Sequence, residues 1–150
     1  DILVCAKGMG GGMPIGAFIS SKEIMGSFKN NPVLGHITTF GGHPVSCAAS
    51  LATIEVIEKE KLLNTVSEKE ALFKKLLVSP VIKEIRSKGL MLAVEFDSYD
   101  TLKKIIDRSI ENGVITDWFL HCNNSMRIAP PLTITLSQIE ESCEVILRTI

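Results

Sequence analysis

This chain of 150 residues has few aromatic side chains and almost no net charge. Tryptophan and tyrosine occur once each, and Phe, Trp and Tyr together make up 5% of the residues. Lys plus Arg number 16 against 17 for Asp plus Glu, a formal net charge of −1. This balance excludes a broadly basic surface, so we expect no nucleic-acid partner and no polybasic attachment to a membrane.

Long apolar runs and paired cysteine motifs are lacking too. No stretch reaches the roughly 18 uninterrupted apolar residues that would predict a membrane span. The four cysteines include no C-x-x-C pair, and the chain lacks the cysteine density of small secreted domains. We therefore expect reduced thiols and a cytoplasmic protein.

The chain begins inside an apolar run. Residue 1 is Asp, and the apolar residues 2–6 follow without the basic region of a signal peptide. Such a run is typical of a strand buried on both faces. We therefore expect a piece of a longer protein, with apolar surface on residues 1–61 left exposed unless another part or a partner covers it.

Hydrophobic spacing predicts two parts of different character. In residues 1–61 it predicts strands over 2–6 and 17–20, a glycine-rich loop over 8–16 and a connecting helix over 45–60. In residues 62–150 it predicts a helix over 62–78, a strand over 89–96, a helix over 100–112 and strands over 114–120 and 125–129. A last helix begins at the capping box formed by Thr135 and Gln138. This order predicts a compact α+β lobe.

Two other interpretations of the loops fail on spacing or ligands. The dinucleotide motif needs glycine where this sequence has Met13 or Ile15, and the P-loop lysine must follow the glycines rather than precede them. His43 and Cys47 lie four residues apart with His36 nearby, but no carboxylate completes a metal shell. We predict neither a nucleotide phosphate site nor a metal site here.

Lys7 ends the first apolar run and is followed at once by glycine. In open α/β sheets the carboxyl ends of the strands face the ligand. A lysine there is expected to be partly desolvated, which favours the neutral amine that attacks a carbonyl group in Schiff-base chemistry. The alternative is a lysine that extends from a strand end into water.

Two further elements carry binding chemistry. Thr38 and Thr39 precede a Gly-Gly pair and a helix start, where hydroxyl and backbone N–H groups can bind an anion, although such a pair can also cap a turn. Arg127 shares one face of a predicted strand with the small residues Ser125 and Ala129, so it has room to bind a carboxylate or to form a surface ion pair. An amine, phosphate donors and a carboxylate partner are together what a pyridoxal phosphate enzyme acting on an amino acid needs.

Three segments resemble, in order, the class III, fold-type I aminotransferases, with acetylornithine and ornithine aminotransferases nearest. Residues 2–16 are similar to the segment of the cofactor lysine, and residues 36–44 to the phosphate-contacting threonine segment. Residues 126–133 are similar to the family's Arg-x-x-Pro-Pro-Leu run. The resemblance implies an α/β fold in which residues 1–61 end the large mixed-sheet domain and residues 62–150 form the small α+β domain.

The resemblance also implies roles for single residues. Lys7 would hold pyridoxal 5′-phosphate (PLP) as a Schiff base and move a proton once the amino acid displaces it. Thr39, with Thr38 beside it, would bind the phosphate, in this family that of the neighbouring subunit of a homodimer. Arg127 would hold the carboxylate of the amino acid whose amino group passes to a 2-oxo acid.

The match to the family is incomplete. His43 stands where the family usually has Asn, and residues 87–91 depart from its usual Arg-Gly-x-Gly-Leu-Met, so no role is assigned there. The acid for the pyridine nitrogen, the ring-stacking aromatic and the main phosphate loop would lie upstream, so we expect the 150 residues alone to be inactive. An aminomutase or decarboxylase of the same fold, or a non-catalytic α+β interaction or dimerisation module, are the alternatives.

Overall fold

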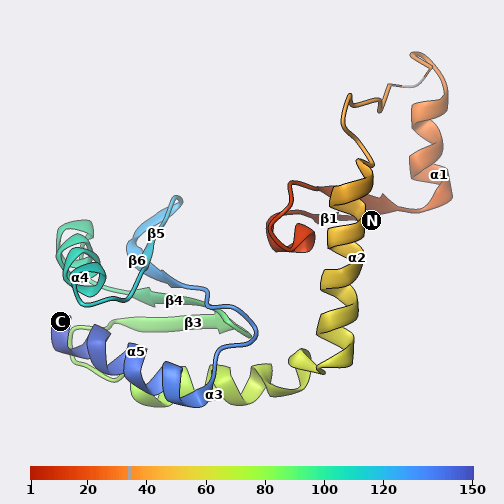
Figure 1. Ribbon diagram of the computed structural model, residues 1–150. Coiled ribbons are helices and arrows are strands. Elements are labelled where there is room, and N and C mark those ends of the chain that lie inside the picture. Colours follow the sequence, from red (N-terminus) through yellow and green to blue (C-terminus); the bar gives the residue numbers. More distant parts are fainter. Residues whose placement is uncertain (34) are drawn as a thin grey trace. The chain divides into compact units, whose positions relative to one another are not determined.

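The chain divides between Lys61 and Leu62 into two units (Figure 1). The computed structural model describes residues 1–33 and 35–150. We call Asp1–Lys61 unit 1 and Leu62–Ile150 unit 2. Their assignment to a large and a small domain stays a prediction.

Unit 1 contains a two-stranded antiparallel sheet. β1 (Ile2–Cys5) pairs with β2 (Ala17–Ser20) so that Ile2 faces Ser20 and Cys5 faces Ala17. The predicted loop between them opens with a 3-10 turn, η1 (Lys7–Gly10). The polar stretch that follows, where no element was predicted, forms the short helices α1 (Lys22–Met25) and η2 (Gly26–Lys29).

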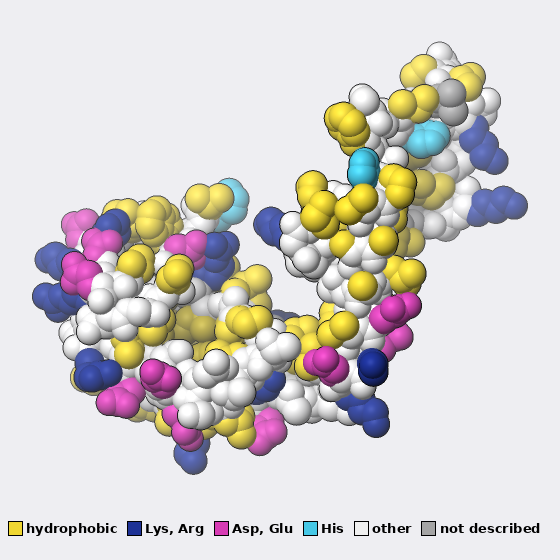
Figure 2. Space-filling view, in the orientation of Figure 1, with side chains coloured by type: hydrophobic (Ala, Val, Ile, Leu, Met, Phe, Trp, Pro, Cys, Tyr) yellow, Lys and Arg dark blue, Asp and Glu magenta, His cyan; other side chains and the backbone are white. Residues whose placement is uncertain are grey.

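The long helix of unit 1, α2 (Pro44–Lys59), turns small polar side chains inward and apolar ones outward. Pro44 lies in its first turn, as predicted, since proline there forgoes no helical hydrogen bond. Ser46 and Ser50 are buried, whereas Leu51 and Ile54 are exposed by 58% and 47%. Figure 2 shows hydrophobic side chains gathered over this helix. The expectation of exposed apolar surface on residues 1–61 is confirmed.

Unit 2 is built on a four-stranded antiparallel sheet of order β3-β4-β6-β5. Its strands are β3 (Glu84–Lys88), β4 (Met91–Glu95), β5 (Asp117–Phe119) and β6 (Cys122–Ile128). Its helices are α3 (Val66–Leu76), preceded by the 3-10 turn η3 (Leu62–Thr65), α4 (Tyr99–Glu111) and α5 (Leu136–Thr149). The predicted order missed β3, an edge strand in which charged residues take every second position. Charged side chains on an edge strand discourage pairing with other chains. They also leave no apolar alternation from which the strand could be predicted.

One face of this sheet forms the core. Leu92 and Val94 of β4 are fully buried, as is Met126 of β6. The helices complete the cluster with buried apolar side chains, among them Phe73, Leu77, Leu102, Ile105, Ile106, Ile139, Cys143 and Ile146. The capping box of α5 is confirmed, because the Thr135 hydroxyl accepts from the Gln138 N–H and the Gln138 side chain accepts from the Thr135 N–H.

The opposite face of the sheet, which we call the open face, carries charged and small side chains. Directly paired residues of antiparallel strands point to the same face. One row across the open face therefore runs Arg86, Ala93, Arg127 and Asp117. Within the described residues, none of the helices is long and apolar enough to cross a membrane.

Candidate functional site

Lys7 lies immediately after β1 in a backbone conformation that is unusual for a lysine. Its φ angle is +55°, and Ala6 before it is extended. The left-handed region costs a residue other than glycine about 1–3 kcal/mol, and such residues cluster at functional sites. Asn31 and Lys61 adopt it too, with φ angles of +44° and +52°. The side chain is exposed, so the predicted partial desolvation is wrong for these 150 residues.

The glycines that follow Lys7 let the loop approach a helix. Gly11 has a φ angle of +56°, and a Cβ atom there would lie 2.2 Å from Oγ1 of Thr53 on α2. That hydroxyl is held in place because it donates to the Ala49 carbonyl at 2.8 Å. The glycine backbone therefore lies close against α2, which positions the loop that carries Lys7.

The two threonines line a groove of about 580 Å³ at the N-terminus of α2. Thr38 begins a tight turn, in which a Cβ atom on Gly41 would lie 2.3 Å from the Thr38 hydroxyl. His43, the residue before the helix, gives the first turn of α2 no side-chain cap. Hydroxyl groups beside an uncapped helix N-terminus suit a phosphate group. Lys7 is not among the residues that line this groove.

His36, His43 and Cys47 are the residues that raised the question of a metal site. Across residues 1–33 and 35–150, His, Cys, Asp and Glu form no group of three that could hold an ion. The His36 ring packs against Phe28 instead, with ring centres 5.7 Å apart.

Arg127 projects from β6 on the open face, while Met126 and Ile128 point into the core. Its Nη2 forms an ion pair with Asp117, the directly opposite residue of β5, and the two side chains are 43% and 45% exposed. The Thr116 hydroxyl donates to the Arg127 carbonyl at 2.7 Å and fixes the backbone. The surface ion pair is thus present, and it occupies one nitrogen of a guanidinium that has five N–H donors.

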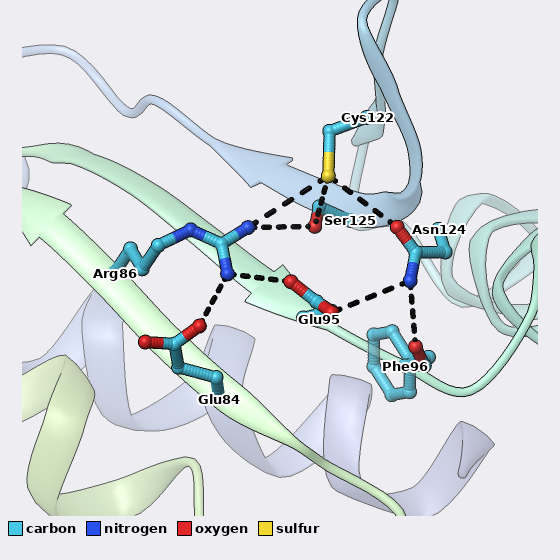
Figure 3. A network of polar contacts seen from close by, with 7 residues as sticks. All are labelled: Glu84, Arg86, Glu95, Phe96, Cys122, Asn124 and Ser125. Carbon is cyan, nitrogen blue, oxygen red and sulfur yellow. Dashed lines mark hydrogen bonds and ion pairs between the residues drawn. The ribbon is translucent and has the colours of Figure 1, made fainter.

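Ser125 was expected to leave space beside Arg127 but is fully buried. It lies under the side chain of Arg86, whose Nη2 donates to the serine hydroxyl at 3.2 Å (Figure 3). Arg86 Nη1 also lies 2.5 Å from a carboxylate oxygen of both Glu84 and Glu95. The hydrogen bond from Arg86 lowers the pKa of Glu95 below its ordinary value. Arg86 therefore ties β3 and β4 to β6.

The same network reaches the start of β6. Cys122 Sγ lies 3.2 Å from the Ser125 hydroxyl, and the Asn124 amide donates to the Phe96 carbonyl at 3.0 Å (Figure 3). These contacts hold the turn that joins β5 to β6.

A second groove, of about 410 Å³, lies on the open face of unit 2. We call it the tip groove because the β5–β6 turn forms one of its sides. It is lined by Arg127 together with Arg86, Ala93, Phe119, Leu120, His121 and Cys122. Trp118, the neighbour of Phe119 in β5, is not among them and packs edge-on against Tyr99. Arg86 and Ala93 were missed, because only the register of the strands brings them there.

Comparison with known proteins gives one consistent result. A family model described as aminotransferase class-III matches residues 1–150. The acetylornithine aminotransferase of Caldanaerobacter subterraneus subsp. tengcongensis is 37% identical over 151 residues, which are 97% of this chain and 37% of that relative. The chain therefore spans little more than a third of the length of this relative.

Solved structures of similar proteins cover the whole chain. The ornithine aminotransferase of Toxoplasma gondii, which has PLP at partial occupancy in its active site, is 32% identical with a TM-score of 0.86 and covers 99% of this chain and 36% of its own. The acetylornithine aminotransferase of Elizabethkingia anophelis is 32% identical with a TM-score of 0.83, covering 100% and 38%. The predicted mixed α/β fold is confirmed by these matches.

Proposed function

Because the chain belongs to the class III aminotransferases, we propose that it takes part, within a longer polypeptide, in moving an amino group from an amino acid to a 2-oxo acid. The family match along all 150 residues is the observation that carries this proposal. Ornithine-like or acetylornithine-like ω-amino donors are the proposed substrates. The support is that an ornithine aminotransferase and two acetylornithine aminotransferases match the chain over nearly its full length.

PLP is the proposed cofactor, and Lys7 is its proposed point of attachment. When bound, PLP acts as an electron sink for the carbon that bears the amino group. Lys7 would supply the amine that holds the cofactor, and its freed side chain would move a proton on the substrate. The left-handed backbone at Lys7 supports a functional constraint at this position.

The groove at the N-terminus of α2 is the proposed phosphate site. The Thr39 and Thr38 hydroxyls and the N–H groups of the first turn donate to phosphate oxygens. As the family resemblance implies, we propose that Thr39 binds the cofactor held by a second copy, so that the working protein is a homodimer.

Arg127 is the proposed partner of the substrate carboxylate. Its backbone is fixed by Thr116, and its guanidinium is held at one nitrogen by Asp117. The remaining donors can bind a carboxylate through two parallel hydrogen bonds.

We further propose that residues 1–150 alone do not transaminate and that the protein is cytoplasmic. The exposed Lys7 supports the first statement, since a nucleophilic amine needs a partly dry site. Four free cysteines support the second. Turnover of amino donors by the isolated 150-residue chain would contradict the first statement, and stable disulfides in the native protein would contradict the second.

Borohydride reduction tests the central assignment. The complete protein that contains this chain is loaded with PLP, reduced and digested, and the labelled peptide is identified by mass spectrometry. We expect the label on Lys7, its loss in Lys7→Ala, and its retention in Lys22→Ala, which removes another exposed lysine of unit 1. A label on a different lysine, or no label at all, would refute the assignment.

A further inference from the structure

The groove at the N-terminus of α2 contains a single titratable side chain. Its lining comes from residues 14–16, from residues 38–43 and from Ser46. None of these is Asp, Glu, Lys or Arg, so across the loop, the turn and the helix only His43 presents a group that changes its charge. His43 is exposed. The side-chain charge that an anion meets in this groove therefore depends on one imidazole ring.

His43 is held by its backbone, which leaves its side chain available. Its N–H donates to the Phe40 carbonyl at 3.2 Å, and its carbonyl accepts from the Cys47 N–H at 3.0 Å. The imidazole gives the helix no cap. A histidine gains a positive charge between about pH 8 and pH 5, and a charged donor binds a phosphate roughly twice as strongly as a neutral one. His43 is therefore suited to bind an anion in a pH-dependent way.

The first turn of α2 offers backbone donors beside this ring. Pro44 has no N–H group, and without a cap the N–H groups of Val45 and Ser46 have no partner inside the helix. The helix dipole places a partial positive charge at the same end. These features favour an anion, but every helix has such an end, so a binding site needs a second and independent sign.

Ser46 supplies this sign. It is only 5% exposed, and it lines the groove. Its hydroxyl makes no hydrogen bond to the described residues. Because none of their fully enclosed side-chain polar atoms lacks a partner, this hydroxyl keeps contact with the groove. Buried polar groups in native proteins have hydrogen-bond partners, so the Ser46 hydroxyl is expected to donate to a ligand in the groove.

We propose that His43 and Ser46 complete an anion site in this groove, and that protonation of His43 makes the site bind a phosphate group more tightly at about pH 5.5 than at about pH 8. The inference rests on the proposed function in one respect, the binding of a cofactor phosphate here. It adds a buried donor and a pH dependence to that site. Thr38, Thr39 and the backbone cannot supply this dependence, because they do not titrate in this range. The Asn that the family usually has at position 43 could not supply it either.

Calorimetric titration of the complete protein, freed of cofactor, with inorganic sulfate tests the proposal. Sulfate keeps its charge across this range, whereas a phosphate monoester gains a proton near about pH 6. We expect the wild type to bind sulfate about tenfold more tightly at the lower pH than at the higher. His43→Gln should bind it with nearly the same affinity at both. Gln is chosen over Asn because Asn would cap α2 and occupy the N–H groups that the anion needs.

Two serines of α2 form a matched pair that tests the buried donor. Ser46→Ala removes a hydroxyl from the groove and should weaken sulfate binding about threefold to tenfold at both pH values. Ser50→Ala removes an equally buried hydroxyl one turn further along, outside the groove, and should leave the affinity unchanged. The NMR signal of the His43 ring, identified by its absence in His43→Gln, should shift when sulfate is added. Circular dichroism spectra that match the wild type show that each variant is folded.

Three results would overturn the proposal. They are the same pH dependence of sulfate affinity in the wild type and in folded His43→Gln, equal affinities of Ser46→Ala and Ser50→Ala, and a His43 ring signal that sulfate does not shift. None of these bears on the labelling of Lys7. A failure of the proposed function would appear in that labelling, so the two failures are distinguishable.

Discussion

Arg127 and Asp117 are direct register partners on β6 and β5, and their side chains are joined by an ion pair on the open face. The pair fixes one end of a guanidinium whose other donors remain accessible. It joins two neighbouring strands that already share backbone hydrogen bonds, so its role is to orient Arg127 more than to hold the sheet together.

Asp117→Asn is therefore expected to change the free energy of unfolding by less than about 1 kcal/mol, because both partners are more than two-fifths exposed to water. Urea denaturation followed by circular dichroism measures this. A loss of several kcal/mol would mean that the ion pair supports the fold, contrary to the arrangement described.

The two faces of β4 give a matched pair of substitutions. Leu92→Ala removes a fully buried side chain and is expected to cost about 2–5 kcal/mol of unfolding free energy. Met91→Ala, one residue away on the open face, removes a side chain that is 52% exposed and should cost much less. Similar losses in the two variants, measured by urea denaturation, would show that the open face is covered in solution.

Glu70 makes the stability of unit 2 depend on pH. Its carboxylate accepts from the Ser87 hydroxyl at 2.6 Å and from the Gly89 N–H at 2.9 Å, and the bond from Ser87 is the largest cause of its lowered pKa. Because the carboxylate is favoured in the folded state, its contribution is present above the ordinary value of 4.5 and is lost as the pH falls through the lowered pKa.

Glu70→Gln should therefore destabilise the chain at neutral pH and reduce the loss of stability on acidification below pH 4.5. Unfolding curves across that range measure both effects. Glu68→Gln, on the exposed side of the same helix, is the control and should keep the pH dependence of the wild type. An unchanged pH profile in Glu70→Gln would contradict the assignment.

The four cysteines should differ in their reaction with iodoacetamide. Burial raises the pKa of Cys143, which is 1% exposed, to about 12, so almost no thiolate forms there at neutral or mildly alkaline pH. Cys47 is exposed on α2. Mass spectrometry of the folded chain should find Cys47 labelled and Cys143 unlabelled until urea is added. Equal labelling of both without urea would show that α5 does not pack as described.

Elements with a strong apolar stripe and a capping residue were predicted from the sequence. In α4 the stripe of Leu102, Ile105 and Ile106 is buried, and the helix begins after Ser98, whose hydroxyl accepts from the Thr101 N–H. β3 was missed because an edge strand buries too little to show an apolar pattern. The strand predicted over 114–120 proved shorter, as β5 spans only Asp117–Phe119.

The candidate site residues are predicted from their chemical type, but the sequence did not predict their surroundings. Thr38 and Thr39 do line a groove beside a helix start, as the Gly-Gly-His-Pro segment suggested. The exposure of Lys7 depends on what lies around the loop, and nearby residues in the sequence do not determine it. The row of Arg86, Ala93 and Arg127 depends on strand register, which is set by where each turn ends.

Side chains alternate between the two faces of β4, so different residues of this strand pack the core and line the groove. Leu92 and Val94 serve the core, while Ala93 between them is half-buried and faces the tip groove. Substitutions at position 93 therefore reshape the groove without removing a side chain from the core. Because most mutations destabilise a fold, a position outside the core lets natural variation or directed evolution reshape the groove at less cost in stability than a change at Leu92 or Val94.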